Sequence, residues 1–105
     1  MTDLTVIEEI AIERRRQIEV EGWTAEHDDE HGRNDLVRAA IAYAWAQTDT
    51  GSGMATSYAA NVVWPWSLEW WKPRGRRRDL VRAAALIVAE IERLDRASAL
   101  AQGRE

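Results

Sequence analysis

The chain of 105 residues and 12.0 kDa has room for one compact domain and not for two. Hydrophobic residues make up 46% and charged residues 30%, and no apolar run approaches the roughly 20 residues of a membrane span, so we expect a soluble protein with no membrane partner. The absence of cysteine excludes thiol nucleophiles, disulfides and thiolate metal sites. The acidic N-terminus lacks the pattern of a signal peptide, which favours a cytoplasmic location.

The net charge of −4 hides two segments of opposite sign. Residues 1–31 contain three arginines against ten acidic residues, whereas residues 72–82 contain five arginines and one lysine against a single aspartate. Thirteen of the fourteen cationic residues are arginine, the side chain that binds phosphate and carboxylate groups in a bidentate manner.

The first predicted element is a helix over residues 4–21. Thr5 followed by Glu8 is a capping-box pattern, and Gly22 is placed to end the helix. Its apolar positions recur near one face: Ile7, Ile10, Ala11 and Ile18. A polar, acidic loop over residues 22–34 follows.

The second predicted helix covers residues 35–47 and ends where the sequence TDTGSG begins. Asn34 or Asp35 is suited to cap it. Apolar residues recur along it at helical spacing: Leu36, Val37, Ala40, Ile41, Ala44 and Trp45.

A connector rich in glycine and tryptophan is predicted for residues 48–75. Residues 54–63 are compatible with a short helix or an extended segment, and Pro65 and Pro73 leave room for one or two helical turns between them. The last predicted helix, over residues 76–99, has an apolar stripe: Leu80, Ala84, Ile87, Val88, Ile91 and Leu94. The strand pattern is missing throughout, so the predicted class is all-α, a small bundle of three main helices with a Trp/Pro-rich connecting segment.

The hexapeptide DLVRAA occurs at residues 35–40 and again at residues 79–84. Each copy begins with an aspartate near the positive end of a predicted helix dipole, so the two helices are candidates for structural equivalents. Their alanine-rich faces permit close helix packing but fill little volume, which favours a homo-oligomer.

The densest candidate for a binding site combines tryptophans with cations. Indole rings stack on nucleobases and guanidinium groups bind phosphates, so this composition suits a nucleotide-derived anion. In a chain without phenylalanine the same tryptophans are also needed as large core residues. The predicted ligand-binding residues are Trp64, Trp66, Trp70, Trp71, Lys72, Arg74, Arg76, Arg77, Arg78, Arg82 and Arg15.

A second candidate site is the acidic loop EHDDEH at residues 26–31. On a helix His27 and His31 lie one turn apart, and with Asp28 and Asp29 they form a possible ligand set for Mg²⁺ or Mn²⁺. The chemistry of such a site is the attack of metal-bound water on a phosphoanhydride. Capping of the next helix, or pairing with the arginines at 14–16, explains the same residues without a metal.

Several motifs in this order resemble a widespread family of small phage and prophage proteins with no agreed function. The motifs are ERRRQ (13–17), EGWT (21–24), EHDDEH (26–31), WPW (64–66), WWKP (70–73), RRDLVRAA (77–84) and EIERLD (90–95). The resemblance implies a phage-encoded protein acting in the cytoplasm of an infected bacterial host. The sequence departs from the family at Asn34-Asp35-Leu36, where Gly-Glu-Leu is usual.

Three hypotheses follow for function. The first is a binding module that captures a nucleotide-derived anion, by analogy with small phage proteins that sequester nucleotide immune signals as an anti-defence device. The second is a metal-dependent nucleotide phosphohydrolase that uses the EHDDEH loop, and the third is a module that docks on a host protein. We favour binding over catalysis, and the net negative charge disfavours duplex nucleic acid as a partner.

Overall fold

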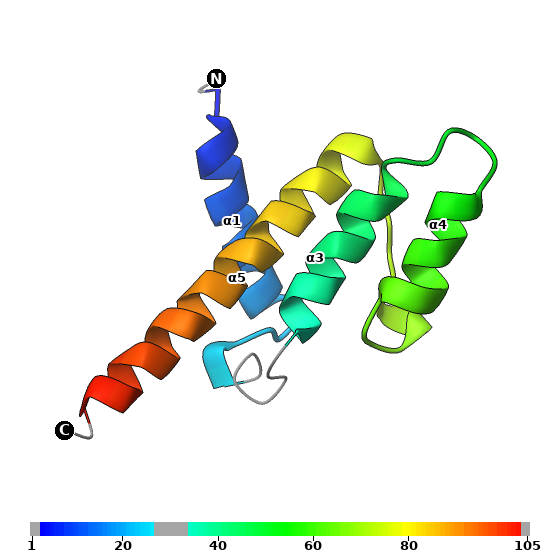
Figure 1. Cartoon of the computed structure of the whole chain (residues 1–105). Coiled ribbons are helices and arrows are strands. Elements are labelled where there is room, and N and C mark those ends of the chain that lie inside the picture. The colour runs from blue at the N-terminus through cyan, green and yellow to red at the C-terminus, as the bar shows by residue number, and fades with distance from the viewer. Residues whose placement is uncertain (1–2, 27–33, 104–105) are drawn as a thin grey trace.

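The computed structural model describes residues 3–26 and 34–103 of the chain, and within them it is all-α, as predicted. The main helices are α1 (Val6–Glu19), α3 (Asp35–Ala46), α4 (Met54–Tyr58) and α5 (Arg76–Gly103), as Figure 1 shows. The connector adds a π-helix at Ala59–Val63 that continues α4, and a 3₁₀ turn at Leu68–Trp70. Residues 54–63 are therefore helical, one of the two conformations that the sequence allowed.

The two ends of α1 are set by local chemistry. Thr5 and Glu8 form the predicted capping box, with the Thr5 hydroxyl accepting the Glu8 N–H at 3.1 Å and the Glu8 carboxylate accepting the Thr5 N–H at 2.9 Å. After the helix, Gly22 takes a positive φ of 75° and the Trp23 N–H reaches back to the Gln17 carbonyl at 2.9 Å. The helix is thus two residues shorter at each end than residues 4–21.

The longest helix, α5, begins at Arg76 as predicted and continues to Gly103, four residues beyond the predicted end. It runs across the molecule beside α1 and α3, and its C-terminal end projects past both (Figure 1). No helix within residues 3–26 and 34–103 combines the length and the apolar character that crossing a membrane requires.

The core lies between α3 and α5 and is closed by tryptophans. Small residues on both helices bring them together, and the indoles of Trp23 and Trp64 belong to the same buried cluster. The buried residues of the cluster are Trp23, Leu36, Ala39, Ala40, Ala42, Tyr43, Ala59, Trp64, Ala83, Leu86 and Ala89. Because alanine fills so little volume, the aromatic rings supply most of the bulk of this core.

The predicted apolar stripe of α5 does not face this core. Its four largest members, Leu80, Ile87, Ile91 and Leu94, are 43–52% exposed. The side of α5 that packs inside the molecule carries smaller and polar residues instead: Asp79, Val81, Arg82, Ala83, Ala85, Leu86 and Ala89. The helix is apolar on two sides, and the alanine-rich side is the one that allows close approach to α3.

The two copies of DLVRAA are also turned differently about their helix axes. Leu36 is 1% exposed whereas its counterpart Leu80 is 43% exposed, and Arg82 is buried whereas Arg38 is exposed. The copies are therefore not structural equivalents.

Both arginines of the repeat nevertheless bind the connector. Arg38 donates to the carbonyls of Val62 at 2.7 Å and Val63 at 3.2 Å, at the C-terminal end of the π-helix, where a cation offsets unpaired carbonyls. Arg82 donates to the carbonyl of Lys72 at the other end of the connector. The tryptophan segment is thus fixed to α3 at one end and to α5 at the other.

We predict that Asp79→Ala lowers the free energy of unfolding by about 3–5 kcal/mol, because it removes one partner of a buried ion pair with Arg82 and leaves buried donors unpaired. The measurement is urea unfolding followed by circular dichroism. Asp95→Ala, an exposed aspartate on the same helix, is the control and leaves stability nearly unchanged. Equal effects of the two substitutions would contradict this account of Asp79.

Candidate anion-binding pocket

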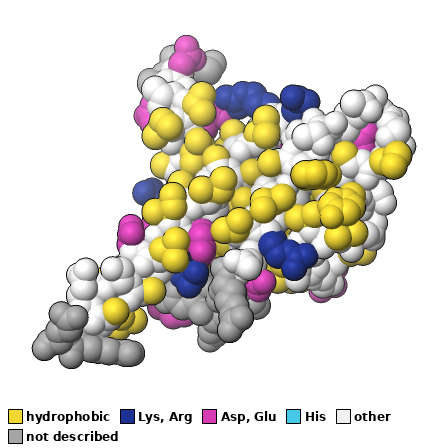
Figure 2. All heavy atoms as spheres, viewed as in Figure 1, with side chains coloured by type: hydrophobic (Ala, Val, Ile, Leu, Met, Phe, Trp, Pro, Cys, Tyr) yellow, Lys and Arg dark blue, Asp and Glu magenta, His cyan; other side chains and the backbone are white. Residues whose placement is uncertain are grey.

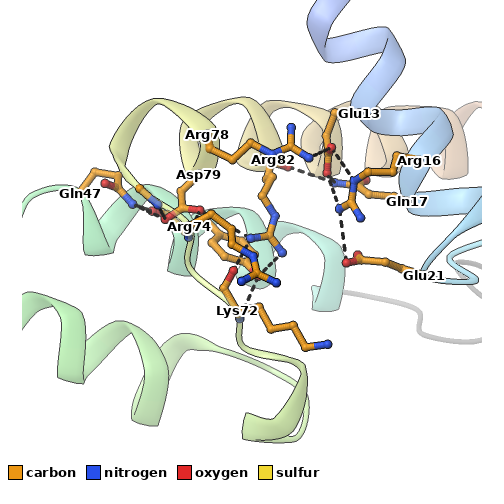
Figure 3. A network of polar contacts seen from close by, with 12 residues as sticks. Glu13, Arg16, Gln17, Glu21, Gln47, Lys72, Arg74, Arg78, Asp79 and Arg82 are labelled. Atoms are coloured by element: carbon orange, nitrogen blue, oxygen red, sulfur yellow. Dashed lines mark hydrogen bonds and ion pairs between the residues drawn. The ribbon is translucent and has the colours of Figure 1, made fainter.

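A small basic pocket of about 110 Å³ lies between the C-terminal end of α1 and the first turns of α5. Figure 3 shows the polar network around it. Five of its six lining residues are cationic: Arg16, Lys72, Arg74, Arg78 and Arg82, with Glu21 as the sixth. The pocket therefore brings together cations from α1, the connector and α5.

Asp79 shapes the connector side of this pocket. Its carboxylate is 1% exposed and accepts the backbone N–H of Arg74 at 2.9 Å, the N–H of Gly75 at 3.4 Å and the side-chain amide of Gln47 at 3.1 Å. These bonds hold the chain before α5 against the helix, and Gly75 with a φ of 134° permits the sharp entry. The backbone of Arg74 is thereby fixed at the rim.

Arg82 forms the floor of the pocket, 4% exposed. Its guanidinium donates to the Tyr43 hydroxyl at 2.8 Å and to the Lys72 carbonyl, lies 3.6 Å from the Asp79 carboxylate, and stacks over the Tyr43 ring at 4.3 Å. Burial raises the pKa of the Tyr43 hydroxyl, although the positive charge of Arg82 acts against that rise. Tyr43 is therefore a neutral acceptor for the guanidinium.

Glu13 holds the α1 side of the pocket. It is 1% exposed and accepts two hydrogen bonds from Arg16 at 2.8 Å, one from Arg78 and one from Gln17 at 3.3 Å. Burial raises the pKa of the Glu13 carboxyl, but the hydrogen bonds and charges of Arg16 and Arg78 outweigh it, so the pKa lies below its ordinary value. The ionised carboxylate keeps the two arginines in place.

The pocket has more cations than acids. Glu13 balances part of the charge of Arg16 and Arg78, and Asp79 lies beside Arg82. Within the described part of the chain, neither Lys72 nor Arg74 has a carboxylate within ion-pair distance of its side chain. Among the described residues, counting the adjoining acids Glu13, Glu21 and Asp79 against the five lining cations leaves two positive charges in excess.

Most of the predicted tryptophans pack inside the molecule rather than at this pocket. Trp64 is 6% exposed and meets the Tyr43 ring edge-on at 5.4 Å, while Trp71 stacks on the same ring at 4.7 Å. Trp66 is half-buried against Trp23 at 5.2 Å. Trp70 differs, because it is 48% exposed and has the Lys72 ammonium 5.5 Å from its ring centre.

Three of the predicted arginines lie elsewhere. Arg76 donates to the Gln47 carbonyl at 2.9 Å, and Arg77 forms two bonds of 2.7 Å with Glu9, whose pKa its hydrogen bonds lower. Arg15 is exposed beside a groove between α1 and α5.

The predicted ligand-binding residues included Arg15 but not Arg16, and Glu13, Glu21 and Tyr43 were not predicted as parts of this site. The run of arginines at 14–16 was a signal for an α1 contribution, but helical geometry directs Arg16, three residues after Glu13, toward the pocket and Arg15 away from it. Tyr43 lies within an apolar helix and gave no signal.

The predicted metal ligands His27, Asp28, Asp29 and His31 lie outside the described residues. Among residues 3–26 and 34–103 there is no group of three or more histidine, aspartate and glutamate side chains that could hold a metal ion. The role of Mg²⁺ or Mn²⁺ at these residues stays a prediction.

Known proteins provide no independent assignment of the pocket. Comparison of the chain with models of protein families, with curated proteins and with solved structures gives no match. The chemistry of the pocket itself is the basis for a functional proposal.

We predict that Glu13→Gln lowers the free energy of unfolding at pH 7 by about 1–3 kcal/mol, the cost of losing charge-assisted hydrogen bonds. Because the native pKa of Glu13 lies below its ordinary value of 4.5, its contribution is present above that pH and is lost as pH falls through the native pKa. Stability of the wild type therefore declines below about pH 4.5 more steeply than that of Glu13→Gln.

The measurement is urea unfolding between pH 7 and pH 3. Glu9→Gln, which removes an exposed pair with Arg77, is the matched control and has the smaller effect at pH 7. A Glu13→Gln protein with unchanged stability and an unchanged pH profile would show that Glu13 is not the anchor described above.

Proposed function

We propose that this protein is a binding module for a small phosphate-bearing anion, with a nucleotide-derived molecule as the ligand class. The observation that supports this is the convergence of five cations on one pocket with an excess of positive charge. Guanidinium groups that are held in place by the protein's own acids keep their remaining N–H donors for a ligand.

The volume of the pocket suits a phosphate group rather than a whole nucleotide. A volume of 110 Å³ equals that of roughly three or four water molecules. The rest of a nucleotide would lie outside the pocket. Trp70, half exposed and next to Lys72, supplies an aromatic surface on which a base can stack for about 1–3 kcal/mol.

The geometry favours binding over hydrolysis. The adjoining carboxylates Glu13, Glu21 and Asp79 all bind arginines or backbone N–H groups. A carboxylate whose pKa is lowered, as for Glu13, is a weak general base. In the phage setting that the motifs imply, capture without turnover would remove a nucleotide immune signal from the host.

We predict that Arg74→Ala raises the dissociation constant for the ligand about tenfold or more, the equivalent of about 1.4 kcal/mol. The Arg74 side chain forms no ion pair within the described part of the chain, so Arg74→Ala should fold normally. The measurement is tryptophan fluorescence titrated with phosphate, pyrophosphate, ADP-ribose and cyclic dinucleotides. Trp70→Ala should weaken the binding of the nucleotides and leave the binding of pyrophosphate unaffected.

Arg76→Ala is the matched control, since this nearby arginine faces the Gln47 carbonyl and does not line the pocket. Chromatography of the ligand after heat denaturation of the complex separates the two main hypotheses. Recovery of unchanged ligand supports sequestration, whereas a product whose formation requires Mg²⁺ or Mn²⁺ supports the phosphohydrolase. Absence of binding to every molecule in the panel would refute the proposal.

A further inference from the structure

The second apolar side of α5 has the spacing of a helix-pairing seam. Starting at Leu80, the large and small apolar residues follow at alternating intervals of four and three: Leu80, Ala84, Ile87, Ile91 and Leu94. The apolar positions from Leu80 to Leu94 span two heptads, and the next position of the pattern is the polar Ser98. This is the a/d pattern by which one α-helix packs along another.

Nothing in the described part of the chain covers this seam. Leu80, Ile87, Ile91 and Leu94 are 43–52% exposed, although the opposite side of α5 is buried against α1 and α3. A helix that is apolar on two sides is normally enclosed on both. The C-terminal end of α5 also projects from the body of the molecule, past α1 and α3 (Figure 1).

The surface beside the seam is apolar as well. Two grooves of about 420 Å³ and 260 Å³ run between α1 and α5 and share Ile10. Ile7, 74% exposed, lines the larger groove, and Leu80 lines the smaller one. Figure 2 shows hydrophobic side chains spread across α1, α5 and α3 on one face, more than single scattered apolar residues would give.

The chain is flatter and more extended than a compact single domain of its length. Its extents are 53 × 40 × 20 Å and its radius of gyration is 15.0 Å, whereas a compact domain of this length has a radius of gyration of about 13 Å. One broad apolar face on a thin molecule is what a partner would cover.

We propose that this face is the interface of a homodimer in which α5 pairs with α5 of a second copy in antiparallel orientation. The charges along α5 favour this partner and this direction. In its first turn Arg77 and Arg78 pair with Glu9 and Glu13 of α1, which leaves Arg76 without a carboxylate partner among the described residues. Near the other end of α5, Asp95 is exposed. Antiparallel pairing places Arg76 beside Asp95 of the second copy, whereas parallel pairing places the Arg76 side chains of the two copies next to each other.

The seam is also complementary to itself in this orientation. In the register that aligns Leu80 with Ile91 of the second copy, Ala84 lies opposite Ile87 of the second copy. A small residue then faces a large one in each of the two central layers, which lets side chains interlock without a void. The two-fold axis generates two further layers from these two, which gives four in all, as an interface between identical surfaces requires.

The test is the mass of the full chain in solution without ligand, measured by sedimentation from 1 to 200 µM. The wild type is expected to be a dimer of twice 12.0 kDa at the upper concentrations. Ile87→Glu, at the centre of the seam, should raise the dissociation constant of the dimer at least 100-fold. Ile12→Glu is the matched control, because Ile12 is 55% exposed, against 49% for Ile87, and lines neither groove; it should remain dimeric.

A wild type that stays monomeric at 200 µM would overturn the proposal, as would a dimer that Ile87→Glu leaves intact. If Ile87→Glu loses its helical circular dichroism signal, Ile91→Gln replaces it with the same expectation. Orientation is tested by mixing Arg76→Cys and Asp95→Cys proteins, since the wild type has no cysteine. A disulfide dimer that forms in the mixture supports antiparallel pairing, and efficient dimers of each variant alone contradict it.

Discussion

The buried guanidinium of Arg82 is the interaction on which the rest of the structure depends. A charge removed from water requires partners, and Arg82 finds them on three elements: Tyr43 on α3, the Lys72 carbonyl in the connector and Asp79 on α5 itself. Removing any of these leaves a buried charge partly uncompensated. The connector therefore has to pass over Tyr43, which brings Trp71 onto the same aromatic ring.

The same kind of constraint orders the rest of the pocket. Asp79 and Glu13, both almost fully buried, hold the arginines and the chain around them in place through hydrogen bonds within the protein. A site that is already ordered loses less conformational entropy on binding. The tryptophans contribute mainly by closing the core in a protein without phenylalanine, and Trp70 remains as the one predicted indole that is largely exposed within residues 64–71.

Features determined by neighbours in the chain could be predicted from the sequence. They include the capping box at Thr5, the stop at Gly22, the start of α5 at Arg76 and the break after α3, because each depends on residues a few positions apart. The partners of the arginines could not be predicted, since Arg77 meets Glu9 and Arg78 meets Glu13 only after α1 and α5 have packed. The buried side of α5 was missed because its alanines give only a weak hydrophobic pattern in the sequence. Their small side chains nevertheless allow the close contact with α3 that buries this side.

The repeated hexapeptide serves as an internal comparison of what local sequence decides. Six identical residues adopt the same helix twice, yet one copy directs its leucine inward and the other its arginine. The six residues are thus helical in both settings, and residues outside them determine how they are rotated about the helix axis. If the two segments were aligned as products of a gene duplication, their helical backbones would superpose. The burial seen in one copy would then be assigned to the wrong side chains of the other.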